Sequence, residues 1–279
     1  MPRPRSPSRP ALRTRPSPTA ALAALLVAGV ATAEDARYGA ADLAALIEQE
    51  QWIEFLDHAT DLRPSERDAR WTEQLGTAAV GALEEARARD PYEAWALLTD
   101  LDARFRPLRD SAPWLEARAG AGLEAARDCF ETSYRTGECR DALDALVAGD
   151  PDSATLAFEA GRVVSLNAHV AGALPFFASA VASAGTAEER TGYCADDAVR
   201  RAAVAALEFT DEANVARARE LAAGPCEAEL AEPLFDAFLD GDATFAANAC
   251  PLWLGEGAPL DARLTDFQRA HCADAEAAR

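Results

Sequence analysis

The residues of this chain best able to react with one another are its six cysteines: Cys129, Cys139, Cys194, Cys226, Cys250 and Cys272. An even number of cysteines indicates disulfides when a chain folds outside the cytoplasm, and six allow fifteen complete pairings. Pairing between sequence neighbours is the simplest arrangement, because Cys129 would end one helix and Cys139 would begin the next. A bridge between Cys226 and Cys250 is the main competing arrangement. We therefore expect a disulfide-stabilised fold with no free thiol.

The remaining chemically capable side chains form no catalytic or metal-binding motif. The three histidines are scattered, at His58, His169 and His271. His271 with Cys272 and Asp274 has the residue types of a ligand cluster, but that cysteine completes the even set. Adjacent acids such as Asp196 and Asp197 suit the first turn of a helix, where the helix dipole favours negative charge. The sequence therefore predicts no catalytic residue, no metal site and no cofactor, and hence a protein that is not an enzyme.

The first 33 residues have the composition of a signal peptide. Residues 1–18 contain five arginines and no acid, Thr19 to Val30 is apolar, and Ala31-Thr32-Ala33 has the small-x-small pattern that a signal peptidase cleaves. A membrane anchor is the alternative, but a bilayer span needs about 20 apolar residues. We expect cleavage before Glu34 and export to the periplasm or the medium, with no stable membrane insertion afterwards.

The exported chain is strongly acidic. Residues 1–33 hold five of the 27 basic residues and none of the 47 acidic ones, so their removal leaves a formal charge of −25. Such a charge opposes binding to nucleic acid and favours basic protein surfaces or cationic ligands. The alternative is the solvated surface of a protein from a salt-adapted or GC-biased organism, which is consistent with the absence of lysine.

Helical periodicity recurs along the rest of the chain and predicts an all-α fold. The run Ser65 to Asp68 is typical of a capping box before a helix that reaches about Ala88. Asp90-Pro91 marks the next start, with a capping aspartate followed by proline in the first turn. A break bracketed by Pro107 and Pro113 then divides an N-terminal helical region, 34–108, from a region of helical hairpins, 111–279.

Shorter helices are expected after this break, joined into antiparallel hairpins by brief turns. One such turn is Ser165 to Asn167, in which Asn167 is the candidate to cap the returning helix. The predicted ranges of these helices are Trp114 to Asp128, Cys139 to Ala148, a pair within Asp152 to Ala184, Ala195 to Glu208, Asp211 to Ala222, Glu227 to Leu239, Thr244 to Cys250, and a last helix that carries Leu264, Phe267 and Ala270. Such hairpins favour a stacked α-solenoid over a single globular core.

The stretch Asp152 to Ala184 has the clearest repeat spacing. Gly161 is followed by Ala173 twelve residues later, by Phe177 four further on and by Ala180 three further on. This pattern resembles the tetratricopeptide repeat, whose period is 34 residues. The resemblance implies that Gly161 faces Ala173 at a close helix crossing, and that Phe177 and Ala180 pack on the next repeat.

The same resemblance implies that the first helix of the unit lines a concave, ligand-facing surface. Glu159 and Arg162 lie off its apolar stripe, so they are the candidate partner-binding residues. We therefore expect a non-catalytic, extracytoplasmic helical-repeat protein that binds a protein or a peptide. The alternatives are an all-α enzyme, or enzyme-associated domain, with unidentified carboxylates, and a structural component of the cell envelope.

Overall fold

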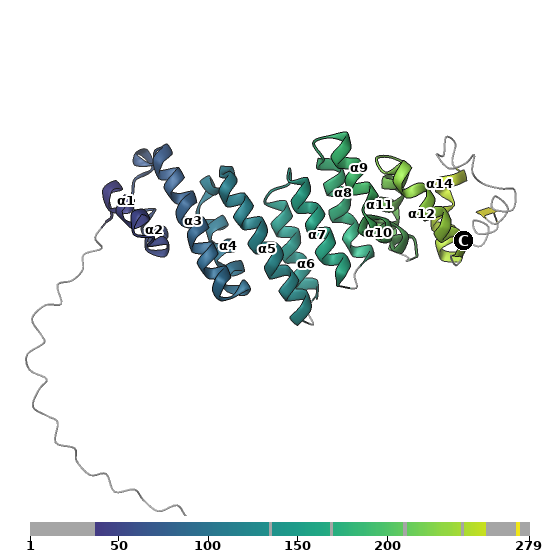
Figure 1. Ribbon diagram of the computed structural model, residues 1–279, viewed down its shortest axis with the longest axis horizontal. Helices are drawn as coiled ribbons and strands as arrows, with labels where there is room; N and C mark the ends of the chain where they lie inside the picture. The colour runs from purple at the N-terminus through teal and green to yellow at the C-terminus, as the bar shows by residue number, and fades with distance from the viewer. Residues whose placement is uncertain are drawn as a thin grey trace, which may run out of the picture. The chain divides into compact units, whose positions relative to one another are not determined.

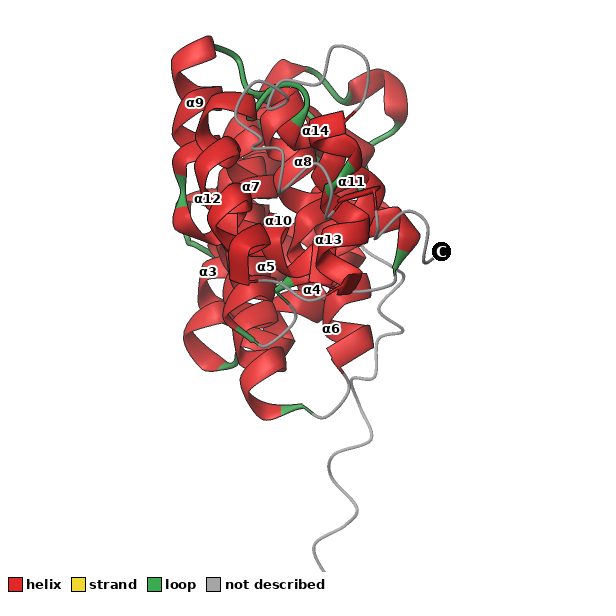
Figure 2. Ribbon diagram, turned by 90° about the vertical axis from the view of Figure 1, so that its right-hand side faces the viewer, coloured by secondary structure: helices red, strands yellow, loops and turns green. Residues whose placement is uncertain are grey.

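The computed structural model describes residues 37–133, 136–167, 170–208, 211–240, 243–254 and 272–273. Every regular element in these ranges is a helix, as Figure 2 shows, so the predicted all-α class is confirmed. Contacts divide the chain into Met1–Arg37 and Tyr38–Arg279, and the described helices all belong to the second unit. The expected signal peptide, 1–33, and the last predicted helix around Leu264 lie outside the described residues.

Fourteen α-helices and three short 3₁₀ helices make up the described chain (Figure 1). The α-helices are α1 Ala40–Glu48, α2 Trp52–His58, α3 Ala69–Arg89, α4 Pro91–Arg104, α5 Ala112–Thr132, α6 Thr136–Ala148, α7 Ala154–Leu166, α8 Leu174–Ser183, α9 Ala187–Ala195, α10 Asp197–Glu208, α11 Glu212–Ala222, α12 Glu227–Asp240, α13 Ala243–Ala249 and α14 Pro251–Leu254. The 3₁₀ helices are η1 Pro64–Glu66, η2 Arg106–Asp110 and η3 Ala171–Ala173.

Local capping chemistry explains where several helices begin. Asp90 caps α4 by accepting a hydrogen bond from the backbone N–H of Tyr92 at 2.7 Å, and Pro91 occupies the first turn, as predicted. The predicted capping box at Ser65 is wrong, because Ser65 lies in the 3₁₀ turn η1. Asp68 caps α3 instead, and its carboxylate accepts from the N–H of Trp71 at 2.9 Å.

Each helix packs against the next one and often against the next but one. Helix α3 contacts α4 and α5, α5 contacts α6 and α7, and α10 contacts α8, α11 and α12. Figure 1 shows α3 to α7 lying side by side in chain order. The proline-bracketed break contains η2, and α3 and α4 on one side of it both pack against α5 on the other.

Small residues let these helices approach closely. The buried face of α3 includes Ala78, Ala79 and Ala82, and larger side chains of neighbouring helices pack where a glycine leaves room. A Cβ atom added at Gly81 would lie 2.6 Å from the indole of Trp52, and one added at Gly122 would lie 2.6 Å from the side chain of Leu146. The glycines therefore set the separation of α2 from α3 and of α5 from α6.

A buried arginine fastens α5 to its two neighbours. The guanidinium of Arg118 donates from Nε to Oδ2 of Asp102 on α4 at 2.6 Å and from Nη1 to the carbonyl of Leu146 on α6 at 2.8 Å. The other oxygen of Asp102 accepts from the indole N–H of Trp114 at 3.1 Å. Because Arg118 is 4% exposed, these bonds compensate for its removal from water.

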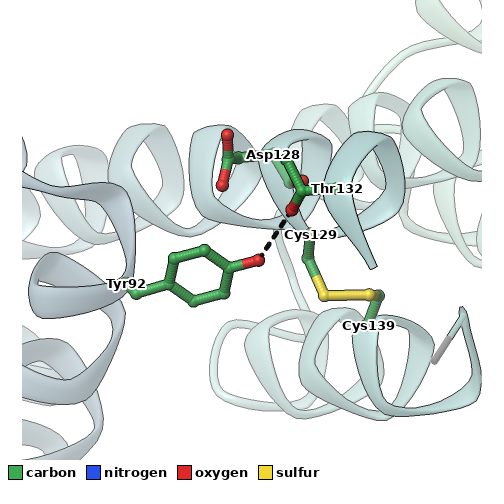
Figure 3. The surroundings of a disulfide bond; sticks show 5 residues. All are labelled: Tyr92, Asp128, Cys129, Thr132 and Cys139. Carbon is green, nitrogen blue, oxygen red and sulfur yellow. Dashed lines mark hydrogen bonds between the residues drawn. A yellow bond between two sulfur atoms is a disulfide. The ribbon is translucent and has the colours of Figure 1, made fainter. Parts of the chain in front are cut away.

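The cysteines pair between sequence neighbours, as predicted, and the competing Cys226–Cys250 bridge is wrong. The three pairs at bonding distance are Cys129–Cys139, Cys194–Cys226 and Cys250–Cys272. Figure 3 shows the first pair joining the last turn of α5 to the first turn of α6. Beside it, the hydroxyl of Tyr92 on α4 lies 3.0 Å from Oγ1 of Thr132, so a hydrogen bond holds α4 to the same end of α5.

Candidate functional site

Helices α10 and α12 enclose a groove of about 810 Å³. The two helices contact each other, although α11 lies between them in the sequence. Residues of α10 form one wall and residues of α12 the other, with Val170 nearby: Asp197, Arg200, Arg201, Val204, Ala205 and Glu208 from α10, and Ala228, Glu229, Glu232, Pro233 and Asp236 from α12. The volume falls within the range of about 300 to 1,000 Å³ that ligand sites typically occupy.

Each of the two helices is amphipathic, with an apolar face buried in the protein and a polar face on the groove. In α10, the residues that turn to the protein interior are mainly small and apolar, among them Val199, Ala203 and Leu207. In α12, Leu230 and Leu234 are fully buried. Burial of these faces leaves the polar stripe of each helix free to form a wall of the groove.

The groove carries an excess of negative charge. Five of its lining residues are acidic and two are arginines. Nε of Arg201 pairs with Oδ2 of Asp197 at 3.1 Å, which neutralises one acid on the α10 wall. The other four acids, Glu208, Glu229, Glu232 and Asp236, form no ion pair within the described part of the chain. Their carboxylates produce a negative potential along the cleft.

Each wall also departs from ordinary helix chemistry at one residue. On α10, Nε of Arg200 is covered by protein and has no acceptor among the described residues. On α12, Pro233 stands inside the helix and has no N–H to donate to the carbonyl of Glu229.

The predicted partner-binding residues Glu159 and Arg162 lie on α7, outside this groove. Arg162 is exposed, as expected, and its Nη1 lies 3.4 Å from Oε1 of Glu159. Glu159 is half-buried and lies 3.9 Å from Nη2 of Arg127 on α5. It is therefore held between two arginines, whereas Arg162 extends over the ring of Phe158 and is the more available of the pair.

A contact between aromatic rings joins α9 to α7. The ring of Tyr193 stacks on that of Phe158 with centroids 4.6 Å apart, and its hydroxyl donates to Oε1 of Glu189 at 2.7 Å. This bond, with a second from the backbone N–H of Gly185, lowers the pKa of Glu189. Glu189 thus orients Tyr193, and the stacked rings hold α9 against α7.

The four residues of the predicted repeat pattern are all buried, but the contact between them differs from the expectation. The atoms nearest to a Cβ added at Gly161 belong to Phe177, with Cε1 at 2.5 Å, and not to Ala173. Phe177 thus packs within its own hairpin, where its ring also lies 5.6 Å from that of Phe158. Ala180 is fully buried on α8. The contact differs from the expected one because the large ring of Phe177 occupies the space that the missing side chain of Gly161 leaves.

The turn between α7 and α8 also differs from the expectation. Asn167, expected to cap the returning helix, ends α7 instead and donates from its amide to the carbonyl of Val163 at 2.8 Å. Ala173 lies in η3, and α8 begins at Leu174 with Pro175 in its first turn. Because proline suits the first helical turn, it fixes the start of α8 several residues later than Asn167 predicts.

The described residues contain no group of three histidine, cysteine or acidic side chains that could hold a metal ion. His58 lies 2.9 Å from the carboxylate of Asp61 and stacks on Tyr38. These contacts join the residues just before α1 to the end of α2. His169 and His271 lie outside the described residues. Within the described ranges, the helices lack the length and apolar character that a bilayer crossing requires.

No protein-family model, curated protein or solved structure matches this chain. The groove was not predicted from the sequence, although two features of the sequence mark its walls. The proline at 233 interrupts an otherwise helical pattern, and the charged residues at 197, 200, 201 and 208 recur on one face of a helix. The function is therefore inferred from the residues that line the groove and not from similarity to known proteins.

Proposed function

We propose that this chain is an exported, non-catalytic helical-repeat protein that binds a protein or peptide partner. Support comes from the pattern of helix contacts. Five hairpins can be defined, α3–α4, α5–α6, α7–α8, α10–α11 and α12–α13, and the first helix of each contacts its own second helix. Each first helix also contacts the first helix of the next hairpin. This is the nearest-neighbour packing expected of a stacked α-solenoid.

The observation that carries the proposal is the groove between α10 and α12. Both are first helices of consecutive hairpins, and stacked repeats use the surface formed by such helices to bind extended partners. Glu159 and Arg162 lie on α7, which is also a first helix. We propose that they contribute to the same surface.

Redox chemistry and charge support the rest of the proposal. All six cysteines pair, which suits an oxidising compartment outside the cytoplasm, periplasmic or extracellular. An acidic chain repels nucleic acid and anionic surfaces, so a protein or peptide partner is the better match.

Site-directed photocrosslinking tests this function. A benzophenone amino acid replaces Ala205, which is half-buried on the α10 wall, and a control chain carries it in place of the exposed Glu84 of α3. Both mature proteins are irradiated in the envelope fraction of their source organism. We expect a discrete crosslinked partner from position 205 and none from position 84. Identical products from the two positions, or none from either, would contradict the proposal.

A further inference from the structure

The acids of the groove are spaced to meet basic side chains. Glu229, Glu232 and Asp236 follow one another at i, i+3 and i+7, so they share one face of α12. At a rise of about 1.5 Å per residue, the first and last are about 10 Å apart along the helix. Side chains on one side of an extended peptide repeat about every 7 Å. Two long, flexible cationic side chains on such a peptide can therefore reach this row.

The size of the groove limits the length of the ligand. From Asp197 to Glu208 the α10 wall is about 16 Å long, given a rise of about 1.5 Å per residue. An extended chain covers that distance in about five residues. Val204, Ala205 and Pro233 supply apolar surface between the charges, on which the methylene stems of arginine or lysine can pack.

We propose that the groove between α10 and α12 binds an extended segment of about five residues of a partner protein, carrying at least two arginine or lysine side chains. This inference rests on the proposed function and adds the ligand class. The carboxylates of α12 receive the cationic side chains. Charge complementarity selects the occupant, because four acids of the groove have no ion-pair partner among the described residues.

Three labelled peptides test the proposal against the mature, disulfide-intact protein by fluorescence anisotropy. Each has five residues and blocked ends, and arginine, glutamate or serine alternates with alanine. We expect the arginine peptide to bind at least tenfold more tightly than the other two, and to weaken as salt screens the ion pairs. Selective binding of the glutamate or serine peptide at the groove would overturn the basic specificity while leaving peptide binding intact.

Matched variants locate the binding. Glu229→Gln with Asp236→Asn removes two groove carboxylates and should weaken the arginine peptide on the order of tenfold. Glu84→Gln with Glu85→Gln removes the same charge from the exposed face of α3 and should change binding less than twofold. Equal losses in the two double variants would overturn the proposal, because the net charge alone would then attract the peptide. The single variant Glu232→Gln serves if the groove pair fails to fold.

Arg200→Met tests the charge of the groove from the opposite direction. Removing a cation from the α10 wall should tighten the arginine peptide severalfold, because the peptide then meets one positive charge fewer. Weaker binding by a variant that keeps its helical circular dichroism would overturn the electrostatic selection of the peptide. Light scattering tests whether a second copy of this chain occupies the groove instead. If the wild type is a dimer and the double variant Glu229→Gln, Asp236→Asn is a monomer, the groove is a dimer interface and the proposal is overturned.

Discussion

The contact between Gly161 and Phe177 permits a quantitative test of how the central hairpin packs. Phe177 is fully buried and its ring lies against α7, so Phe177→Ala should lower the free energy of unfolding by roughly 3 to 5 kcal/mol. Gly161→Ala places a methyl group 2.5 Å from the ring, a distance that the rigid ring cannot accommodate without moving. Overpacking of this kind costs about 1 to 3 kcal/mol.

The two substitutions should not be additive. Alanine is preferred to glycine in a helix interior by about 1 kcal/mol. In the wild type, this gain in helix propensity offsets part of the overpacking cost of Gly161→Ala. In the Phe177→Ala background the ring is absent and only the gain remains. We therefore expect Gly161→Ala to destabilise the wild type by up to about 2 kcal/mol and to stabilise the variant by about 1 kcal/mol.

Urea denaturation of the four disulfide-intact proteins, followed by circular dichroism, measures this cycle. Gly192→Ala is the matched control, since nothing lies within 4 Å of a Cβ added at that helical glycine. It should have the same stabilising effect in both backgrounds. If Gly161→Ala acts equally, within about 0.5 kcal/mol, in the wild type and in Phe177→Ala, the ring does not pack on the glycine and the description of this hairpin is wrong.

Three further predictions concern covalent and buried polar structure. Replacing Cys194 and Cys226 together by serine opens a loop of 32 residues and should lower the free energy of unfolding by about 4 kcal/mol in a urea titration; a loss below 1 kcal/mol would contradict the bridge's role. Asp102→Asn leaves the buried guanidinium of Arg118 without its carboxylate and should cost roughly 3 kcal/mol, part of which Arg118→Met in the same chain should recover; no recovery would argue against a stranded charge. Mass spectrometry of the exported protein should find Glu34 as its first residue, and a chain that still begins at Met1 would refute cleavage.

Features set by neighbouring residues were predictable from the sequence, whereas features set by distant contacts were not. The start of α4 depends on Asp90 and Pro91 alone, and it was predicted correctly. The start of α3 was predicted three residues early because Ser65 and Asp68 both suit a cap, and Pro64 places the former in a 3₁₀ turn. Local chemistry alone does not distinguish such competing caps.

The same reasoning applies to the cysteines and to the groove. Neighbour pairing was predictable for Cys129 and Cys139, because the short turn between α5 and α6 brings them together. The other two pairs span 32 and 22 residues, and they were predicted only as the simplest remaining arrangement. The groove requires α10 and α12 to lie side by side with another helix between them in the sequence, which periodicity does not predict. The partner of Gly161 was likewise missed, since repeat spacing predicts which residues are buried but not which ring fills the gap.

Hydrogen–deuterium exchange tests the central claim, that a partner binds between the first helices of consecutive hairpins, most directly. The mature protein is compared alone and with the partner that photocrosslinking identifies. We predict slower exchange in α10 and α12, around Arg200 and Glu229, with α3 unchanged. Protection confined to α3 and α4, or none anywhere on the chain at a saturating partner concentration, would contradict the account.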